Sequence, residues 1–141
     1  QSSSFAVRYN RAGGMLGVEL VALLQSGELV ALQGDRLLFE VSAAEGIMFN
    51  RAVFLPKGPF DLALAGKCPL WPLIIIREGW RHYRIKVGRE FEVSADRRNR
   101  EGAMADAIGS WCTELEDVLS RSWFQWFVFE PLFRDTPRKN S

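Results

Sequence analysis

The sequence has little of what metal and nucleophile chemistry requires. It contains one histidine, His82, and two cysteines, Cys68 and Cys112, which lie far apart and form no C-x-x-C pair. A site built from histidine and cysteine needs three or four such ligands, so we expect no metal. No G-x-S-x-G elbow, P-loop or G-x-G-x-x-G motif occurs, so we also expect no cofactor. Cys68 precedes a proline and is predicted to be a packed thiol rather than a nucleophile.

The sequence also lacks an excess of one charge and any long apolar run. Its 18 Lys and Arg residues balance 17 Asp and Glu residues, which gives no reason to expect a nucleic-acid partner. No apolar run reaches the roughly 18 residues that a membrane-spanning helix needs. The first ten residues, QSSSFAVRYN, have neither the charged start nor the apolar stretch of a signal peptide. With so few cysteines, these features favour a cytoplasmic protein.

Aromatic residues are plentiful at one place, the segment WFQWFVFEPLF at residues 123–133, which contains six of them. A soluble monomer rarely exposes that much apolar area, so the segment either folds back onto the core or meets a partner or a bilayer. We expect peripheral membrane contact, on the inner face, through Trp123, Trp126 and Phe127. The last residues, 134–141, are expected to form a disordered tail.

Hydrophobic patterns predict a single α/β domain over residues 1–133. Leucines at helical spacing before Gly27 predict a helix that this glycine closes, and the run ELVALQG at 28–34 then predicts a short strand buried on both faces. A second buried strand is predicted at 68–77. The alternation in RHYRIKVGREFEV, at 81–93, predicts a half-exposed antiparallel strand.

Three further elements complete this expectation. Residues 47–55 resemble an irregular strand with a turn inside it, and Pro59 and Gly66 mark the start and end of a short helix. The clearest helix is predicted within residues 97–122, with Asp96 or Asn99 as the residue that caps its start. Its apolar residues fall on one stripe at Met104, Ala107, Ile108, Trp111, Leu115, Val118 and Leu119. The fold class we expect is therefore α/β, with a mixed, mostly parallel sheet flanked by helices.

Candidate functional residues lie where predicted strands end. Asp35 and Arg36 follow the strand at 28–34, at the edge of an open α/β sheet where ligands bind, although the two can equally form a plain ion pair that fixes the next loop. Lys57 and Gly58 come directly before a helix start, where free N–H groups attract anions. Arg77 ends the next strand. Together these groups can hold a phosphate or a thioester-bearing ligand.

The ordered segments LLQSGELVALQGDR, FLPKGPFDLALAGKCPLWPLIIIR, YRIKV and SWFQWFVF resemble the lysophospholipid acyltransferase superfamily. The likeness covers roughly residues 12 to 130 and is greatest to the branch related to the late acyltransferases of lipid A biosynthesis. It implies a partial acyltransferase fold. It also implies transfer of an acyl chain from an acyl carrier protein or coenzyme A thioester to a hydroxyl or amine of a lipid-like acceptor.

The resemblance assigns roles to individual positions. Asp35 and Arg36 match a motif that shapes the acceptor site, and Arg11, or equally Arg8, matches an arginine that holds phosphate or thioester. The family pattern is also matched at Pro56, Gly58, Pro59, Pro69, Pro72, Trp126 and Phe127. Arg11, Arg36 and Lys57 are the groups we expect to place positive charge near the oxyanion.

The family's general base, a histidine in an H-x-x-x-x-D/E motif, has no counterpart here. His82 is followed five positions later by Val87, so no catalytic residue is assigned. Either the chain is the C-terminal part of a larger acyltransferase domain, as its start at QSSS favours, or it is a catalytically dead relative. A separate hypothesis is a non-catalytic α/β binding or interaction module whose contact surface is the aromatic segment.

Overall fold

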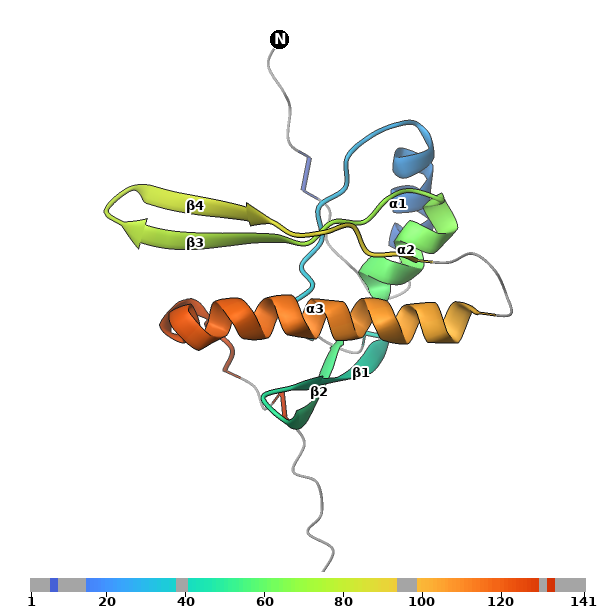
Figure 1. Ribbon diagram of the computed structural model, residues 1–141. Helices are drawn as coiled ribbons and strands as arrows, with labels where there is room; N and C mark the ends of the chain where they lie inside the picture. Colours follow the sequence, from blue (N-terminus) through green and yellow to red (C-terminus); the bar gives the residue numbers. More distant parts are fainter. Residues whose placement is uncertain (1–5, 8–14, 38–40, 94–98, 130–131, 134–141) are drawn as a thin grey trace, which may run out of the picture.

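A computed structural model describes residues 6–7, 15–37, 41–93, 99–129 and 132–133 (Figure 1). Helices and strands both occur, so the expected mixture of α and β elements is confirmed. In chain order the elements are α1 Leu16–Gln25, β1 Ala43–Met48, β2 Arg51–Pro56, α2 Gly58–Gly66, β3 Leu73–Gly79, β4 His82–Val87, α3 Arg100–Ser122 and the 3₁₀ turn η1 Trp123–Gln125.

The predicted mostly parallel sheet is wrong. The strands of the described ranges form two separate antiparallel pairs, β1 with β2 and β3 with β4. The reason is the length of the connections, because strands joined by about two residues can only fold back antiparallel, whereas parallel strands need a long crossover. The β1–β2 turn consists of Phe49 and Asn50, both with left-handed backbone (φ 51° and 57°), at the place where the sequence predicted a turn inside an irregular strand.

The segment at 28–34 is extended but is not the predicted buried strand. Leu29 is 90% exposed and Leu32 43% exposed. The prediction assumed that a short apolar run must lie between two layers, but such a run alone does not reveal whether a neighbouring strand exists. The end of the segment is fixed instead by the Trp111 indole, whose Nε1–H donates to the Gly34 carbonyl at 2.8 Å.

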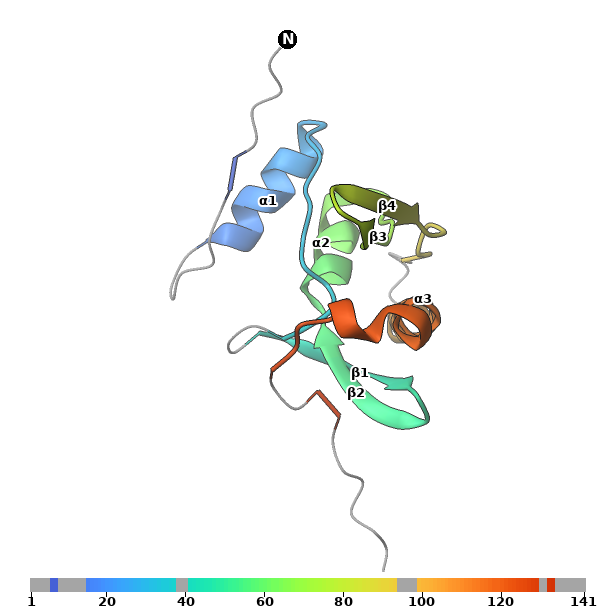
Figure 2. The same cartoon turned by 90° about the vertical axis from the view of Figure 1, so that its left-hand side faces the viewer.

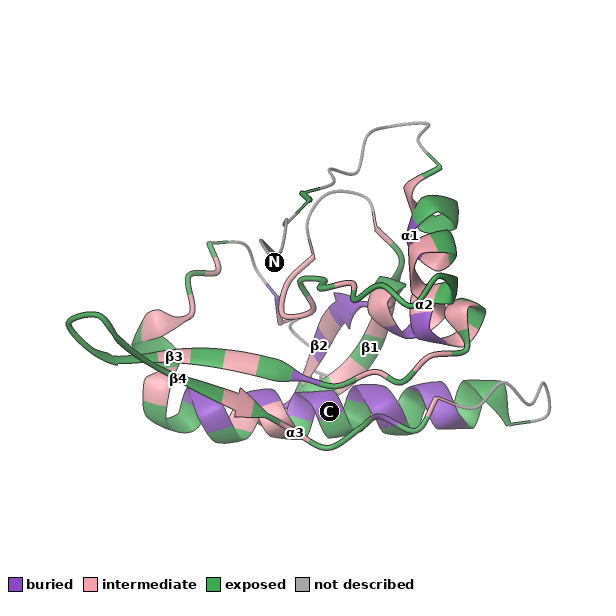
Figure 3. Cartoon of the chain, turned by 90° about the horizontal axis from the view of Figure 1, so that it is seen from above, coloured by how far each residue is buried: buried purple, intermediate pink, exposed green. Residues whose placement is uncertain are grey.

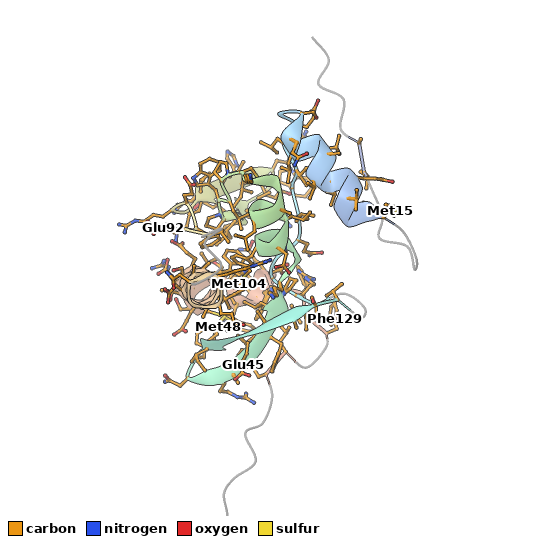
Figure 4. All side chains as sticks on the ribbon, turned by 90° about the vertical axis from the view of Figure 1, so that its right-hand side faces the viewer. Met15, Glu45, Met48, Glu92, Met104 and Phe129 are labelled. Carbon is orange, nitrogen blue, oxygen red and sulfur yellow. The ribbon has the colours of Figure 1, made fainter. Side chains whose placement is uncertain are left out.

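The core forms where α3 crosses the β1–β2 hairpin and the start of α2. All seven apolar residues predicted to share one stripe of α3 are buried, which confirms that helix and its inward face (Figure 3). Met48 of β1 and Met104 of α3 both lie in this interior (Figure 4). Gly46 of β1 lies directly against Cys112 of α3, and burial raises the pKa of that thiol.

The two short helices pack against each other above this core (Figure 2). Gly27 closes α1 as predicted, with φ 86°, and the Glu28 and Gly27 N–H groups donate to the Leu23 and Leu24 carbonyls. This is the paired hydrogen-bond pattern of a glycine-terminated helix. Helix α2 runs from Gly58 to Gly66 with Pro59 in its first turn, which confirms the predicted short helix.

The β3–β4 hairpin projects away from the core (Figure 1). The strand predicted at 68–77 was expected to be buried on both faces. That prediction is wrong, because one face of the hairpin is exposed along its whole length. Leu73, Ile75, Tyr83, Ile85 and Val87 form that exposed face. Ile74 on the opposite face packs against the core.

Candidate functional site

Asp35 and Arg36 lie at the end of the extended segment and bind each other. The Arg36 guanidinium contacts Asp35 Oδ2 through Nη2 at 2.7 Å and through Nε at 3.2 Å. The Trp126 indole also donates to the same oxygen, from Nε1 at 2.9 Å. Three donors thus converge on one carboxylate oxygen, and two of them carry positive charge, which makes these hydrogen bonds stronger than neutral ones.

Two neighbours of Trp126 in the aromatic segment, Phe127 and Gln125, make further hydrogen bonds. Arg36 Nη1 donates to the Phe127 carbonyl at 2.6 Å. The Gln125 side chain pairs with the backbone of Arg77 in β3, accepting from its N–H at 2.8 Å and donating to its carbonyl at 3.0 Å. The Gln125 amide thus satisfies both the backbone N–H and the backbone carbonyl of Arg77, as a residue of a neighbouring strand would.

We call residues Gln125, Trp126 and Phe127 the C-terminal clamp, because Gln125 binds β3 while Trp126 and Phe127 bind the Asp35–Arg36 pair. Of the six predicted site residues, Asp35 and Arg36 come together here through their side chains. Arg77 joins the clamp only through its backbone, because its side chain donates from Nε to the Gly79 carbonyl at 3.1 Å, within its own hairpin. The ion pair that the sequence left open as a structural alternative is present. Its side chains remain 21% and 27% exposed, so it is not sealed in the core.

Lys57 and Gly58 lie at the junction of β2 and α2. In Figure 2 the segment that carries Asp35 ends beside this junction, on the same side of α3. Lys57 Nζ lies 3.9 Å from Asp61 Oδ1. Arg100 Nη2, from the start of α3, lies 3.7 Å from the same carboxylate oxygen. Two cations therefore share one anion here, which leaves a net positive charge at this junction.

The first turn of α2 offers an anion fewer donors than the sequence suggested. Pro59 has no N–H, and the N–H groups of Phe60 and Asp61 already donate to the Lys57 carbonyl. Any anion at this junction would thus depend on the side chains of Lys57 and Arg100 more than on the helix itself.

The remaining predicted residues are placed as follows. Arg11 and Arg8 lie outside the described residues. Of the aromatic residues expected to meet a membrane, Trp123 and Phe127 are exposed, whereas Trp126 is partly buried and packs against the core. His82 Nδ1 lies 3.2 Å from the Trp80 carbonyl in the β3–β4 hairpin.

Sequence reasoning missed the polar roles of the clamp and of Arg100. Trp126 and Phe127 were interpreted by their apolar surface, and no local pattern reveals that an indole N–H or a main-chain carbonyl will find a partner 91 residues away. The one available signal was the order Q-W-F, which was linked to the family resemblance but not to Asp35.

Within the described ranges, no three histidine, cysteine, aspartate or glutamate side chains gather as a metal site. Among the same residues, no helix combines the length and apolar composition needed to cross a bilayer.

Comparison with known proteins adds no relative. No family model matches the chain, and no curated protein or solved structure matches it.

Proposed function

We propose that this chain supplies the acceptor-side and thioester-binding part of an acyltransferase, which moves an acyl chain from an acyl carrier protein or coenzyme A thioester to a hydroxyl or amine of a lipid-like acceptor. The observation that carries the proposal is the convergence of segments that are distant in sequence. The Asp35–Arg36 pair and the Q-W-F segment, matched separately to the family pattern, contact each other directly.

The chemistry of the pair suits a positioning role. Three of the five N–H donors of Arg36 are occupied by Asp35 and by the Phe127 carbonyl, so the guanidinium is held in place with two donors unassigned. A fixed cation of this kind stabilises developing negative charge without having to reorganise during the reaction. The positive junction of Lys57 and Arg100 would face the phosphate or pantetheine part of the donor.

Attack of the acceptor on a thioester needs a base that takes its proton, and then an acid that protonates the leaving thiolate. The sequence contains no H-x-x-x-x-D/E motif, so the proposal assigns this step to no residue of the chain. We accordingly expect the chain to bind an acyl thioester but to transfer no acyl group.

Calorimetric titration with a non-hydrolysable thioether analogue of acyl-coenzyme A tests this. We expect saturable binding that Lys57→Gln weakens about tenfold, as expected for the loss of one charge-assisted contact. Lys67→Gln is the matched control, because Lys67 lies at the other end of the same helix and carries the same charge. No binding by the folded wild-type chain, or equal weakening by both variants, would refute the proposal.

The same titration separates the second hypothesis. A non-catalytic interaction module gives no heat with the thioether analogue. Reading the gene upstream of Gln1 for an H-x-x-x-x-D/E segment provides an independent check, and where such a segment exists, Asp35→Asn in that longer product should lower acyl transfer without unfolding it.

A further inference from the structure

The turn of the β3–β4 hairpin and the C-terminal end of α3 lie at the same end of the molecule (Figures 1 and 3). They are joined by the hydrogen bonds between the Gln125 amide and the Arg77 backbone. Residues from two distant parts of the sequence are thereby held on one surface, at the end of the molecule that faces away from α1 and α2.

Large aromatic side chains at this end of the molecule are exposed. Trp80 in the hairpin turn is 81% exposed, and Trp123 and Phe124 in η1 are 71% and 61% exposed. Trp123 and Phe124 contact each other edge to face, with ring centroids 6.2 Å apart. Each such side chain left in water forgoes roughly 1.5–3 kcal/mol of burial free energy, so three together indicate a surface that is covered in use.

The charge around these rings is positive. Residues 73–87 contain four basic side chains and one acidic side chain. Glu78 pairs with Arg84, and Lys86 is engaged by Glu114 and Asp117 of α3. Among the described residues no carboxylate pairs with Arg81, which stands in the turn beside Trp80 and leaves the tip cationic.

We propose that Arg77, Trp80, Arg81, Trp123 and Phe124, which we call the tip surface, rest on the headgroup region of a bilayer that carries anionic lipids. Indole rings favour the boundary between headgroups and acyl chains, where the ring is apolar and its N–H remains wet. Basic side chains beside them add attraction to anionic headgroups. The tip projects outward, a shape that fits a flat, deformable surface.

The tip surface goes beyond the proposed function, because it would bind a bilayer whether or not the chain binds acyl thioesters. A lipid-like acceptor is, however, presented at such a boundary. Docking by the tip would hold the Gln125–Phe127 clamp, and the Asp35–Arg36 pair behind it, close to the membrane surface.

Vesicle co-sedimentation with the whole chain tests this inference. We expect the wild type to bind vesicles of phosphatidylcholine mixed with phosphatidylglycerol, and to bind pure phosphatidylcholine vesicles less. The double variant Trp80→Ala with Trp123→Ala should lower the partition coefficient at least about tenfold. Trp71→Ala is the matched control, since Trp71 is an exposed tryptophan just before the other end of the hairpin, and it should change binding less than about twofold.

A further variant, Arg81→Asn, tests the contribution of positive charge to vesicle binding. Asparagine is chosen because it tolerates the left-handed backbone that Arg81 adopts (φ 60°). This variant should weaken binding about fivefold on phosphatidylglycerol vesicles and leave binding to phosphatidylcholine unchanged. Circular dichroism should show all variants folded, because the altered side chains are exposed. Absence of vesicle binding by the wild type, equal loss in Trp71→Ala, or loss of a dimer on gel filtration when Trp80 and Trp123 are replaced would overturn the inference.

Discussion

Replacing Trp126 with phenylalanine tests the C-terminal clamp, because it keeps an aromatic ring and removes the N–H that donates to Asp35. A hydrogen bond to a charged acceptor contributes roughly 1.5–3 kcal/mol to the free energy of unfolding. Asp35 and Arg36 are 21% and 27% exposed, so solvent screening reduces the expected loss to about 1–2 kcal/mol. For a chain of this length that corresponds to a decrease in Tm of about 3–6 °C.

A double-mutant cycle separates the hydrogen bond from the smaller ring. Urea unfolding of Trp126→Phe, Asp35→Ala and the double variant should give a coupling free energy of about 1 kcal/mol. Trp123→Phe is the control, because Trp123 is exposed, and it should stay within about 0.5 kcal/mol of wild type. Strict additivity of Trp126→Phe and Asp35→Ala would refute the direct contact.

Three further predictions concern the scaffold. Gly46→Ala would place a Cβ 2.5 Å from Cys112 Sγ, so it should destabilise by about 1–3 kcal/mol in urea unfolding, and less in a Cys112→Ala background, where equal losses would contradict the contact. A Cβ at Gly109, inside α3, meets nothing within 4 Å, so Gly109→Ala should stabilise by about 0.5–1 kcal/mol, and a lower Tm would count against it. The hydrogen bond from Lys86 lowers the pKa of Asp117 below its usual 3.8, and the hydrogen bond to Glu114 raises that of Lys86 above 10.5. The stability that Asp117 contributes is therefore present above pH 3.8 and lost as pH falls through its lowered pKa, and that of Lys86 is present below pH 10.5 and lost as pH rises through its raised pKa. Lys86→Gln should flatten the dependence of the urea midpoint on pH in both ranges, and an unchanged profile would refute the assignment.

Local patterns predicted the elements whose structure depends on near neighbours. The stripe of α3, the glycine that closes α1 and the proline in the first turn of α2 each reflect periodicity or backbone preference within a few residues. In these elements the tertiary structure agrees with the local preference.

The pairing of strands could not be predicted in the same way. The run at 28–34 has the composition of a buried strand, yet it becomes one only if another strand lies beside it, and none of the described strands does. The antiparallel strand predicted at 81–93 is present as β4, paired with β3 across the short turn at Trp80 and Arg81.

The sequence pointed to the Asp35–Arg36 pair but not to the residues that bind it. Asp35 and Arg36 stood out as a charged pair after an apolar run, and the structure confirms that they pair. Their link to Trp126 and Phe127 spans 91 residues of the chain, and long-range hydrogen bonds leave no trace in spacing or periodicity.

The central claim is that the Asp35–Arg36 pair and the clamp belong to a site for an acyl thioester. Heteronuclear NMR of the indole N–H groups during titration with the thioether analogue tests it most directly. The resonances of Trp126 and Trp111, which donate to Asp35 and Gly34, should shift along one saturation curve while that of Trp80, which is 81% exposed in the turn of the β3–β4 hairpin, stays fixed. A saturated complex in which the Trp126 and Trp111 resonances do not move would contradict the account.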